Sequence, residues 1–395
     1  MSRLLQYLLR RTPVGWLQLV HNRMRLIAAV AGIAFANLLV LVQLGVVASL
    51  SSVTQLTFTP FATDIVISPP RPQFLNGEMI SRRLMYSAIA DPAVAEATPL
   101  YVDTIEWKRT DGSSTTLVVY GLPPEADAFA GEAIGAQLEL LAAAKHVLLD
   151  RAIPDVGLDF GTDVVEHLSP DQPLQFEIGG HSVSAVGAFE LGSGFDTAGA
   201  MIVSDQTFQQ LFPERTAGTP SHILLRLKPN QEPAAVAGRI GDRLISERVQ
   251  VRTNAQAIAD DVSYMNDEAS LGIIFGMGVF IGILVGLVIV YQVLSADVAA
   301  HMKEYATFRA MGYSHRFLLG IVFEEAMIIA LLGFLPGVLF GSATYQVMSM
   351  QTGLPIAMSV ERALAILLGT IVACTLSGAL ATFRLRRAEP AELFS

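Results

Sequence analysis

The stretch LGIIFGMGVFIGILVGLVIVYQVL, at positions 271–294, runs for 24 residues without a charged side chain. A segment of roughly 20 apolar residues is long enough to cross the ~30 Å hydrocarbon core of a bilayer as a helix. Three more apolar runs exceed this minimum of roughly 20 residues, at 26–50, 317–348 and 363–383. The sequence therefore predicts a membrane protein with four transmembrane α-helices.

The composition of the 395-residue chain agrees with a membrane setting, because 52% of its residues are hydrophobic and only 16% are charged. Globular proteins carry about 25% charged residues. The first apolar run begins at residue 26 and is 25 residues long. The apolar core of a cleaved signal peptide is about 7–15 residues long. We therefore expect this run to be an uncleaved membrane anchor.

Residues 51–270, between the first two predicted spans, have the composition of a soluble domain. A segment of this length can form one or two compact units with their own cores. Apolar alternation predicts strands at 62–68 and 221–228, and helical patterns lie at 78–90 and 234–246. Turn residues at 110–113 and 179–180 predict two hairpins. The predicted fold class is thus a large extracytoplasmic α+β domain inserted between transmembrane helices 1 and 2.

Basic side chains cluster in the N-terminal arm 1–25, in the loop 295–316 and in the tail 384–395. Short segments rich in Lys and Arg stay on the cytoplasmic side of a membrane. We therefore expect a multi-pass protein of the bacterial inner membrane with both termini and the 295–316 loop in the cytoplasm. The domain 51–270 and the short loop 349–362 would then be periplasmic.

The arm 1–25 opens with apolar and basic side chains at close spacing, which is typical of an amphipathic segment on the cytoplasmic membrane surface. A frayed arm is the alternative. The residues that carry this pattern are Leu4, Leu5, Leu8, Leu9, Arg10, Arg11 and Trp16.

The domain 51–270 is strongly acidic, with 29 acidic against 14 basic residues and a formal charge of −15. This charge argues against nucleic acid as a partner, because nucleic-acid binding depends on neutralising phosphates. The chain contains no P-loop motif, no Gly-x-Ser-x-Gly motif and no HExxH motif. The only cysteine, Cys374, lies inside the fourth span. We expect no catalytic residue, cofactor or metal, so any ATP hydrolysis would belong to a partner subunit.

Two acidic residues, Glu324 and Glu325, interrupt the third span near its cytoplasmic start. A charge at the bilayer centre costs about 3 kcal/mol on insertion scales, so such groups have partners or functions. A structural or coupling role is one interpretation, and a proton pathway, as in a secondary transporter, is the other.

Glycines recur at small-xxx-small spacing in the second and third spans. Such stripes allow helices to approach closely. They predict either contacts within the four-helix set or a seam between two copies of the chain. The residues are Gly278, Gly282, Gly286, Gly333, Gly337 and Gly341.

The loop between the second and third spans contains KEYATFRAMGYSHRF, at positions 303–317. This segment is expected to form a short helix ending at Gly312. Its helical spacing predicts an exposed apolar face formed by Tyr305, Phe308 and Met311. An exposed apolar face rimmed by charge is typical of a docking site. The alternative is that this face lies on the membrane.

The segment from Glu304 to Gly312, EYATFRAMG, resembles the Glu-x-Ala-Thr-Leu-x-Ala-Met-Gly motif of the FtsX-like permease family, which includes MacB-type exporter subunits. It departs from the motif by Phe308 in place of leucine. In that family the motif contacts a separate cytoplasmic ABC ATPase. The resemblance thus implies that an ATPase-coupling site contains Lys303, Glu304, Tyr305, Thr307, Phe308, Arg309, Met311 and Gly312.

Further resemblance, at 32–45, 194–199, 204–208, 290–313 and 374–379, is greatest to the DevC-like, heterocyst-type exporter subunits. It implies the permease subunit of a tripartite ABC exporter, acting as a homodimer with a periplasmic adaptor of the membrane-fusion type and a TolC-like outer-membrane channel. Members of this class are linked to glycolipid export, so membrane lipid is an expected contact and lipid or glycolipid an expected cargo. The alternatives are an FtsX-like regulator of a periplasmic hydrolase and a lipoprotein-releasing permease.

Overall fold

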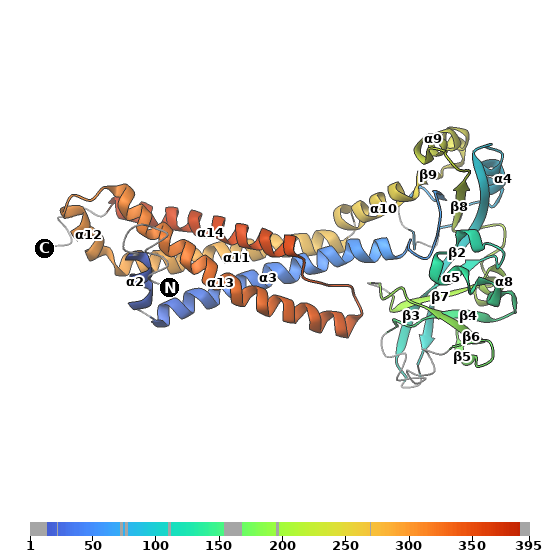
Figure 1. The fold of residues 1–395 in the computed structure, drawn as a ribbon, viewed down its shortest axis with the longest axis horizontal. Helices are drawn as coiled ribbons and strands as arrows, with labels where there is room; N and C mark the ends of the chain where they lie inside the picture. The colour runs from blue at the N-terminus through green and yellow to red at the C-terminus, as the bar shows by residue number, and fades with distance from the viewer. Residues whose placement is uncertain are drawn as a thin grey trace. The chain divides into compact units, whose positions relative to one another are not determined.

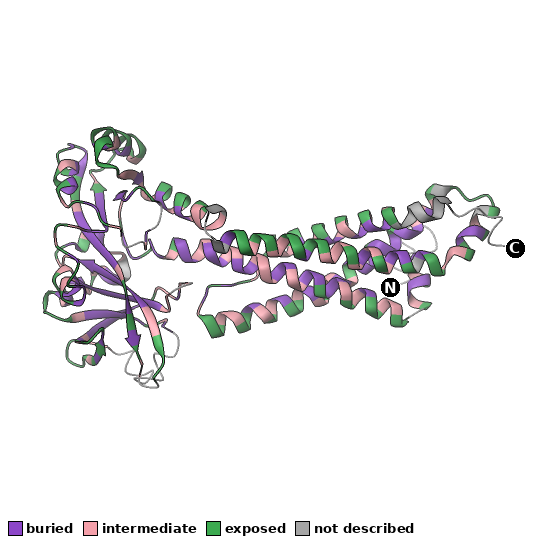
Figure 2. Cartoon of the chain, turned by 180° about the vertical axis from the view of Figure 1, so that it is seen from behind, coloured by how far each residue is buried: buried purple, intermediate pink, exposed green. Residues whose placement is uncertain are grey.

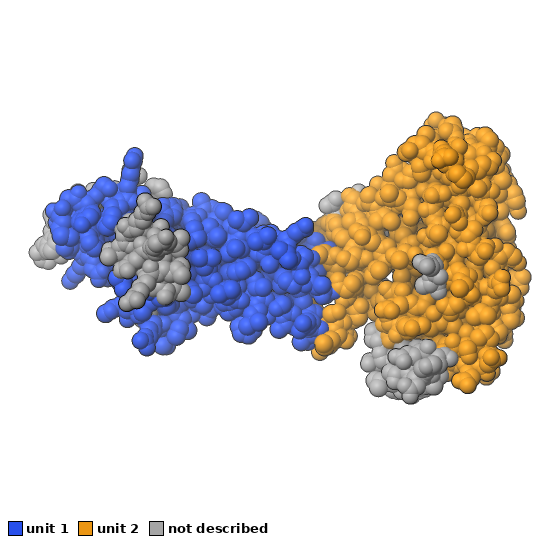
Figure 3. Space-filling model, in the orientation of Figure 1, with its two compact units in different colours: residues 1–47, 274–347, 356–395 blue, residues 48–273, 348–355 orange. Residues whose placement is uncertain are grey.

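The computed structural model describes residues 14–21, 23–71, 74–75, 78–109, 112–153, 168–194, 197–268 and 270–387. The chain divides into two compact units (Figure 3). Unit 1 comprises residues 1–47, 274–347 and 356–395, and unit 2 comprises residues 48–273 and 348–355. The leucine and arginine pattern of residues 1–11 and the tail beyond residue 387 lie outside the described residues.

Unit 1 is built from four long helices that lie side by side (Figure 1). All four are long and apolar enough to cross a membrane. Each predicted span lies inside one of them, although the helices extend well beyond the predicted bounds at several ends. They are α3 (Arg23–Leu56), α11 (Ser270–Ala300), α13 (His315–Thr352) and α14 (Val360–Arg387), and two shorter helices, α2 (Val14–His21) and α12 (Met302–Ala310), accompany them.

Helix α3 contacts each of the other three long helices. A Cβ added at Gly337 of α13 would lie 2.9 Å from the Asn37 Cβ on α3. On α11, a Cβ added at Gly282 would lie 3.1 Å from a methyl of Val40. On α14, the Thr370 hydroxyl hydrogen-bonds the buried Asn37 amide at 2.8 Å. Helix α3 is thus in direct contact with each of the other long helices.

Every predicted packing glycine faces α3. On α11, added Cβ atoms at Gly278 and Gly286 would meet Gln43 and Ala36. On α13, those at Gly333 and Gly341 would meet Ile33 and Leu41. Of the two interpretations of the stripes, the structure favours helix contacts within one chain.

Unit 2 is built on a nine-stranded mixed sheet with the order β5-β6-β4-β7-β3-β2-β8-β1-β9. The β3–β7 and β4–β6 pairs are parallel and the remaining neighbours are antiparallel. The strands are β1 (Ile65–Ser68), β2 (Val94–Lys108), β3 (Ser114–Leu122), β4 (His146–Asp150), β5 (Leu174–Ile178), β6 (His181–Phe189), β7 (Gly199–Ser204), β8 (His222–Leu227) and β9 (Gln250–Thr253).

Both predicted hairpins are confirmed as antiparallel pairs, β2 with β3 and β5 with β6. The β5–β6 turn has φ of 57° at Gly179 and 77° at Gly180. This backbone conformation is accessible to glycine at little cost, which explains why the turn was readable in the sequence.

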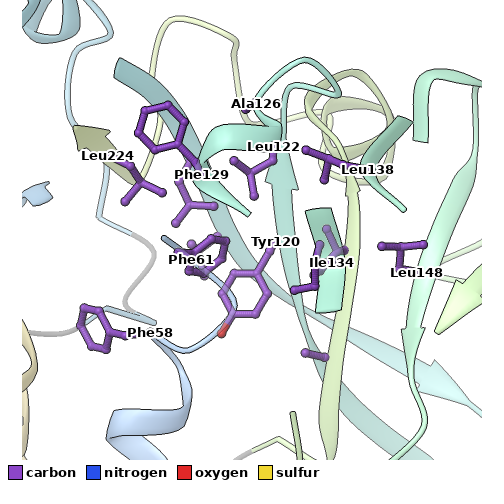
Figure 4. Close-up of a cluster of buried hydrophobic side chains, with 14 of the residues drawn as sticks. Phe58, Phe61, Tyr120, Leu122, Ala126, Phe129, Ile134, Leu138, Leu148 and Leu224 are labelled. Carbon is purple, nitrogen blue, oxygen red and sulfur yellow. The ribbon is translucent and has the colours of Figure 1, made fainter. Parts of the chain in front are cut away.

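The helices of unit 2 cover the sheet and close its apolar cores. Figure 2 shows that the strands are mostly buried. In one core, Phe61 lies edge-on against Tyr120 at 5.2 Å between ring centroids, among the side chains drawn in Figure 4. The helical segments are α4 (Arg83–Ile89), η1 (Asp127–Phe129), α5 (Glu132–Gly135), η2 (Leu138–Ala142), α8 (Asp205–Leu211), α9 (Pro233–Arg243), η3 (Ile245–Glu247), α10 (Asn254–Ser263) and the π-helix η4 (Tyr264–Glu268).

Candidate coupling site

The C-terminal end of α12 is closed by a glycine-based cap. Gly312 has φ of 91°, in the left-handed region that favours glycine. The Tyr313 backbone N–H donates to the Phe308 carbonyl at 3.1 Å, closing the turn around Gly312. The rings of Phe308 and Tyr313 meet edge-on at 5.6 Å, which is the hydrophobic contact expected across such a cap. The predicted end of the helix at Gly312 is therefore confirmed.

An aromatic group joins α12 to the start of α13. Phe317 lies 5.9 Å from Phe308 and stacks on Tyr313 at 4.6 Å between ring centroids. Phe308 and Phe317 are half-buried, whereas Tyr313 keeps 46% of its surface exposed. The sharp turn after α12 is thus held by three rings, and Tyr313 is the ring that remains available to a partner.

The prediction that Tyr305 lies on an exposed face is wrong. Tyr305 is only 1% exposed and belongs to the same buried cluster as Leu318 and Ile321 of α13. Ala306, at 8%, is buried beside it. Of the predicted apolar stripe, Tyr305 faces the bundle, Phe308 is half-buried and Met311 is exposed.

The exposed part of the candidate site consists of polar positions on α12 and of the tip that follows it. Lys303, Glu304 and Thr307 are exposed on the helix. Met311, just beyond the helix, is 60% exposed and adjoins Tyr313. Arg309 is helical, and its side chain lies outside the described residues. Met311 and Tyr313, called here the apolar tip, replace Tyr305 as the exposed apolar contacts.

The two acidic residues of the third span are covered by α2. Glu325 is 0% exposed and Glu324 is 8% exposed. The Trp16 backbone N–H, in the first turn of α2, donates to Glu324 Oε1 at 3.4 Å. A Cβ added at Gly15 would lie 2.9 Å from the Glu325 Cγ. Carboxylates are stabilised near the N-terminal turn of a helix, where backbone N–H groups point outward. This geometry favours the structural interpretation of the pair.

Residues of α2 that the sequence did not single out complete the site. Gly15, Gln18 and Leu19 are its buried positions. Their i, i+3, i+4 spacing is that of one helix face, which is the signal that could have identified them. The pattern was visible, but nothing in the sequence said that α12 and α13 would be its partners.

No group of three or more His, Cys, Asp or Glu side chains that could hold a metal ion occurs among the residues that the structure describes. The buried acidic residues of unit 2 have structural partners instead. Asp150 accepts backbone N–H groups of Ala152, Leu191 and Gly192. Burial raises the pKa of this carboxyl, and those hydrogen bonds oppose the rise.

The arrangement defines a class: a multi-pass membrane protein in which four helices carry a large α+β domain and a short, capped helix between two spans. Two family models match the chain, the MacB-like periplasmic core domain over residues 26–243 and the FtsX-like permease C-terminal over residues 276–390. The chain belongs to this MacB/FtsX-type family of ABC transporter permeases. The permeases of the family are usually non-catalytic, and a separate subunit carries the ATPase.

Three solved structures are similar to about half of the chain, at low identity. The periplasmic region of MacB from Actinobacillus actinomycetemcomitans is 10% identical, with a TM-score of 0.34 over 50% of this chain and 92% of that one. The extracellular domain of YknZ from Gram-positive bacteria is 12% identical, with a TM-score of 0.32 over 48% and 98%. A permease domain from Porphyromonas gingivalis is 13% identical, with a TM-score of 0.29 over 50% and 90%. No curated protein matches the chain significantly.

Proposed function

We propose that this permease is the membrane subunit of a tripartite ABC exporter, working as a homodimer in the bacterial inner membrane with both termini in the cytoplasm. A cytoplasmic ATPase would dock on α12, a periplasmic adaptor would join unit 2 to a TolC-like outer-membrane channel, and cargo would leave from the periplasmic side. The observation that carries this proposal is the capped helix α12 with its exposed apolar tip, in a chain of the MacB/FtsX-type family.

Transmission in this scheme is mechanical. Movement of a docked ATPase would reach α13 through the aromatic contacts of Phe308 and Phe317 and through buried Tyr305. From α13 it would pass to α3, whose residues meet the glycines of α13 directly. Closely packed helices can transmit such a displacement because densely packed protein interiors have low compressibility. This route needs no polar pathway through the membrane.

The second copy is proposed to lie against α11. This helix is the least buried of the four spans: 11% of its most apolar stretch is buried, against 56% for α13. Its exposed side chains include Ile274, Met277 and Phe280. The packing glycines of α11 turn away from this face toward α3, so the dimer contact is assigned to the large side chains, with membrane lipid covering the rest.

The docking role of the apolar tip is tested by replacing it with charge. Tyr313→Asp and Met311→Asp place a carboxylate where a few apolar anchors carry most of the binding energy, so each should cost about 2 kcal/mol of ATPase affinity. The measurement is a pull-down with the cognate ATPase, together with ATP turnover of the reconstituted pair. Gln351→Asp, an exposed position at the opposite end of α13, is the matched control. ATPase binding and turnover that match wild type in both tip variants would rule out this docking surface.

Two other functions of the family remain candidates: regulation of a periplasmic hydrolase, as in division-type FtsX, and lipoprotein release. The sequence resemblance to DevC-like exporter subunits supports export, with lipid or glycolipid as cargo. Co-purification with the products of neighbouring genes, followed by mass spectrometry, separates the three. Recovery of an adaptor supports export, whereas recovery of a hydrolase or a lipoprotein carrier in its place would overturn it.

A further inference from the structure

Helix α12 needs support from the rest of unit 1. It spans nine residues, Met302–Ala310, and is flanked by the non-helical residue His301 and by the turn at Gly312. An isolated helix of this length is marginal in water, so its position depends on tertiary contacts. A coupling helix that tilted freely on its neighbours would lose the displacement applied to it.

One contact comes from α2. The Gln18 amide nitrogen donates to Glu304 Oε2 of α12 at 2.8 Å. Gln18 is only 8% exposed, whereas Glu304 is exposed. Next to Gln18, Leu19 is buried in the same apolar cluster as Tyr305. A hydrogen bond to an ionised carboxylate is stronger than one between neutral groups, particularly where one partner is withdrawn from water.

The first turn of α2 rests on α13. The backbone at Gly15 approaches α13 so closely that an added Cβ would lie 3.1 Å from the Ile321 carbonyl oxygen and 3.2 Å from the Glu325 nitrogen. Trp16 adds its backbone hydrogen bond to Glu324. Helix α2 therefore connects α13 to α12 through contacts separate from the aromatic turn.

We propose that α2 is a structural part of the coupling element and that Gln18 is the positioning residue that fixes α12 through Glu304. This proposal rests on the proposed docking of an ATPase at α12. The residue type is specific: the amide presents a donor to a carboxylate, whereas a glutamate at position 18 would present a second negative charge. Glu324 and Glu325 contact the first turn of the same helix, which gives the two acidic residues of the third span a place in coupling.

A reciprocal exchange tests this assignment on the permease alone. Spin labels at His21 and Ala310, both exposed, report the distance between α2 and α12 in a Cys374→Ala background in nanodiscs. Gln18→Glu should broaden the distance distribution, because two carboxylates then oppose each other. Adding Glu304→Gln to it restores a neutral donor facing a carboxylate and should narrow the distribution again. The charge control is Leu17→Glu, which adds a carboxylate to the exposed side of α2. Position 21, which is also exposed, is not used for this control because it carries a spin label.

The same variants, without labels, are then measured for ATP turnover with the cognate ATPase. Gln18→Glu should lower permease-dependent turnover about tenfold, the order expected for losing a hydrogen bond to a charged group. The double variant should recover most of it, which a purely local folding defect would not allow. An unchanged distance distribution in Gln18→Glu, or a distribution that stays broad in the double variant, overturns the role of Gln18. A wild-type permease that neither binds the ATPase nor alters its turnover would instead overturn the proposed function, whatever the distances show.

Discussion

At the scale of single residues, His222 shows how burial fixes a protonation state in unit 2. The side chain is 1% exposed, its Nε2–H donates to the Phe74 carbonyl at 2.8 Å, and its ring stacks on that of Phe74 at 4.4 Å. Burial lowers the pKa of His222 to about 4; the bond to Phe74 opposes this, and Arg252 and Arg215 add to it. The neutral imidazole is therefore the form that fits.

This protonation state predicts a pH dependence of stability. The folded pKa of about 4 lies below the unfolded value of 6.5, so the unfolded chain binds more protons between these values. The contribution of neutral His222 to the free energy of unfolding is fully present above pH 6.5 and is lost as the pH falls toward 4. Between pH 7 and pH 5 the loss should be about 2 kcal/mol.

The measurement is urea unfolding of unit 2 in the full-length chain in detergent, followed by the fluorescence of buried Trp107 in a Trp16→Phe background. His222→Gln keeps a donor near the Phe74 carbonyl and removes the titrating group. Because the buried carboxyls Asp150 and Asp261 have raised pKa values and oppose the trend, the informative quantity is the difference between wild type and variant. An identical pH slope in the two proteins would show that His222 is not responsible.

At the scale of elements, the bundle of unit 1 depends on how closely its helices approach α3. Gly337 lies against the backbone of α3, since an added Cβ would be 3.2 Å from the Ala34 carbonyl oxygen. In a membrane, where the lipid is as apolar as the side chains, close packing supplies much of the association energy. Asn37 adds a buried interhelical hydrogen bond to Thr370 at the same level of α3.

Gly337→Leu should therefore destabilise the bundle by about 1–3 kcal/mol, the range for overpacking a filled interior. Gly369→Leu on α14 is the matched control, because nothing lies within 4 Å of an added Cβ there. The measurement is thermal unfolding of the monomer in detergent, together with the oligomeric state by light scattering. A loss of dimer with unchanged monomer stability in Gly337→Leu would instead place this glycine at a seam between copies.

The sequence was sufficient for features that depend on local chemistry. The uncharged run at 271–294 predicted a span because transfer into lipid depends mainly on the segment itself. Gly312 and the Gly179–Gly180 pair predicted chain reversals because positive φ favours glycine. Tyr305 was misplaced for the opposite reason. Tyr305 is buried against Leu318 and Ile321 of α13 and in one cluster with Leu19 of α2, which lies far away in the sequence.

The contacts that α3 makes with the other three long helices were equally inaccessible from the sequence. All four spans are apolar, with mean hydropathies between 2.2 and 2.9, and α11 has the highest value although it is the least buried. In a lipid environment hydrophobicity does not report burial, because the exposed face must be apolar as well. The glycines that face α3 indicated close helix packing, but their spacing does not identify the helix that they contact.

At the scale of the whole molecule, charge is distributed unevenly along the chain. Residues 51–270 carry a formal charge of −15, whereas the arm, the loop containing α12 and the tail are rich in arginine. Short basic segments resist translocation, and large domains cross regardless of their charge. The proposed docking of an ATPase on α12 and of an adaptor on unit 2 would require these two parts to lie on opposite sides of the membrane.

Thiol labelling tests this orientation directly. Ser113, at the tip of the β2–β3 hairpin, and Ser314, between α12 and α13, are both exposed, so a cysteine at either position should be reactive once a reagent reaches it. In the Cys374→Ala background, Ser113→Cys should react with a membrane-impermeant maleimide in cells whose outer membrane alone has been opened. Ser314→Cys should react only after the inner membrane is also permeabilised, which serves as its control for accessibility. The reverse pattern would place α12 outside the cytoplasm, where no ATP-driven subunit could reach it, and would remove the basis of the coupling model.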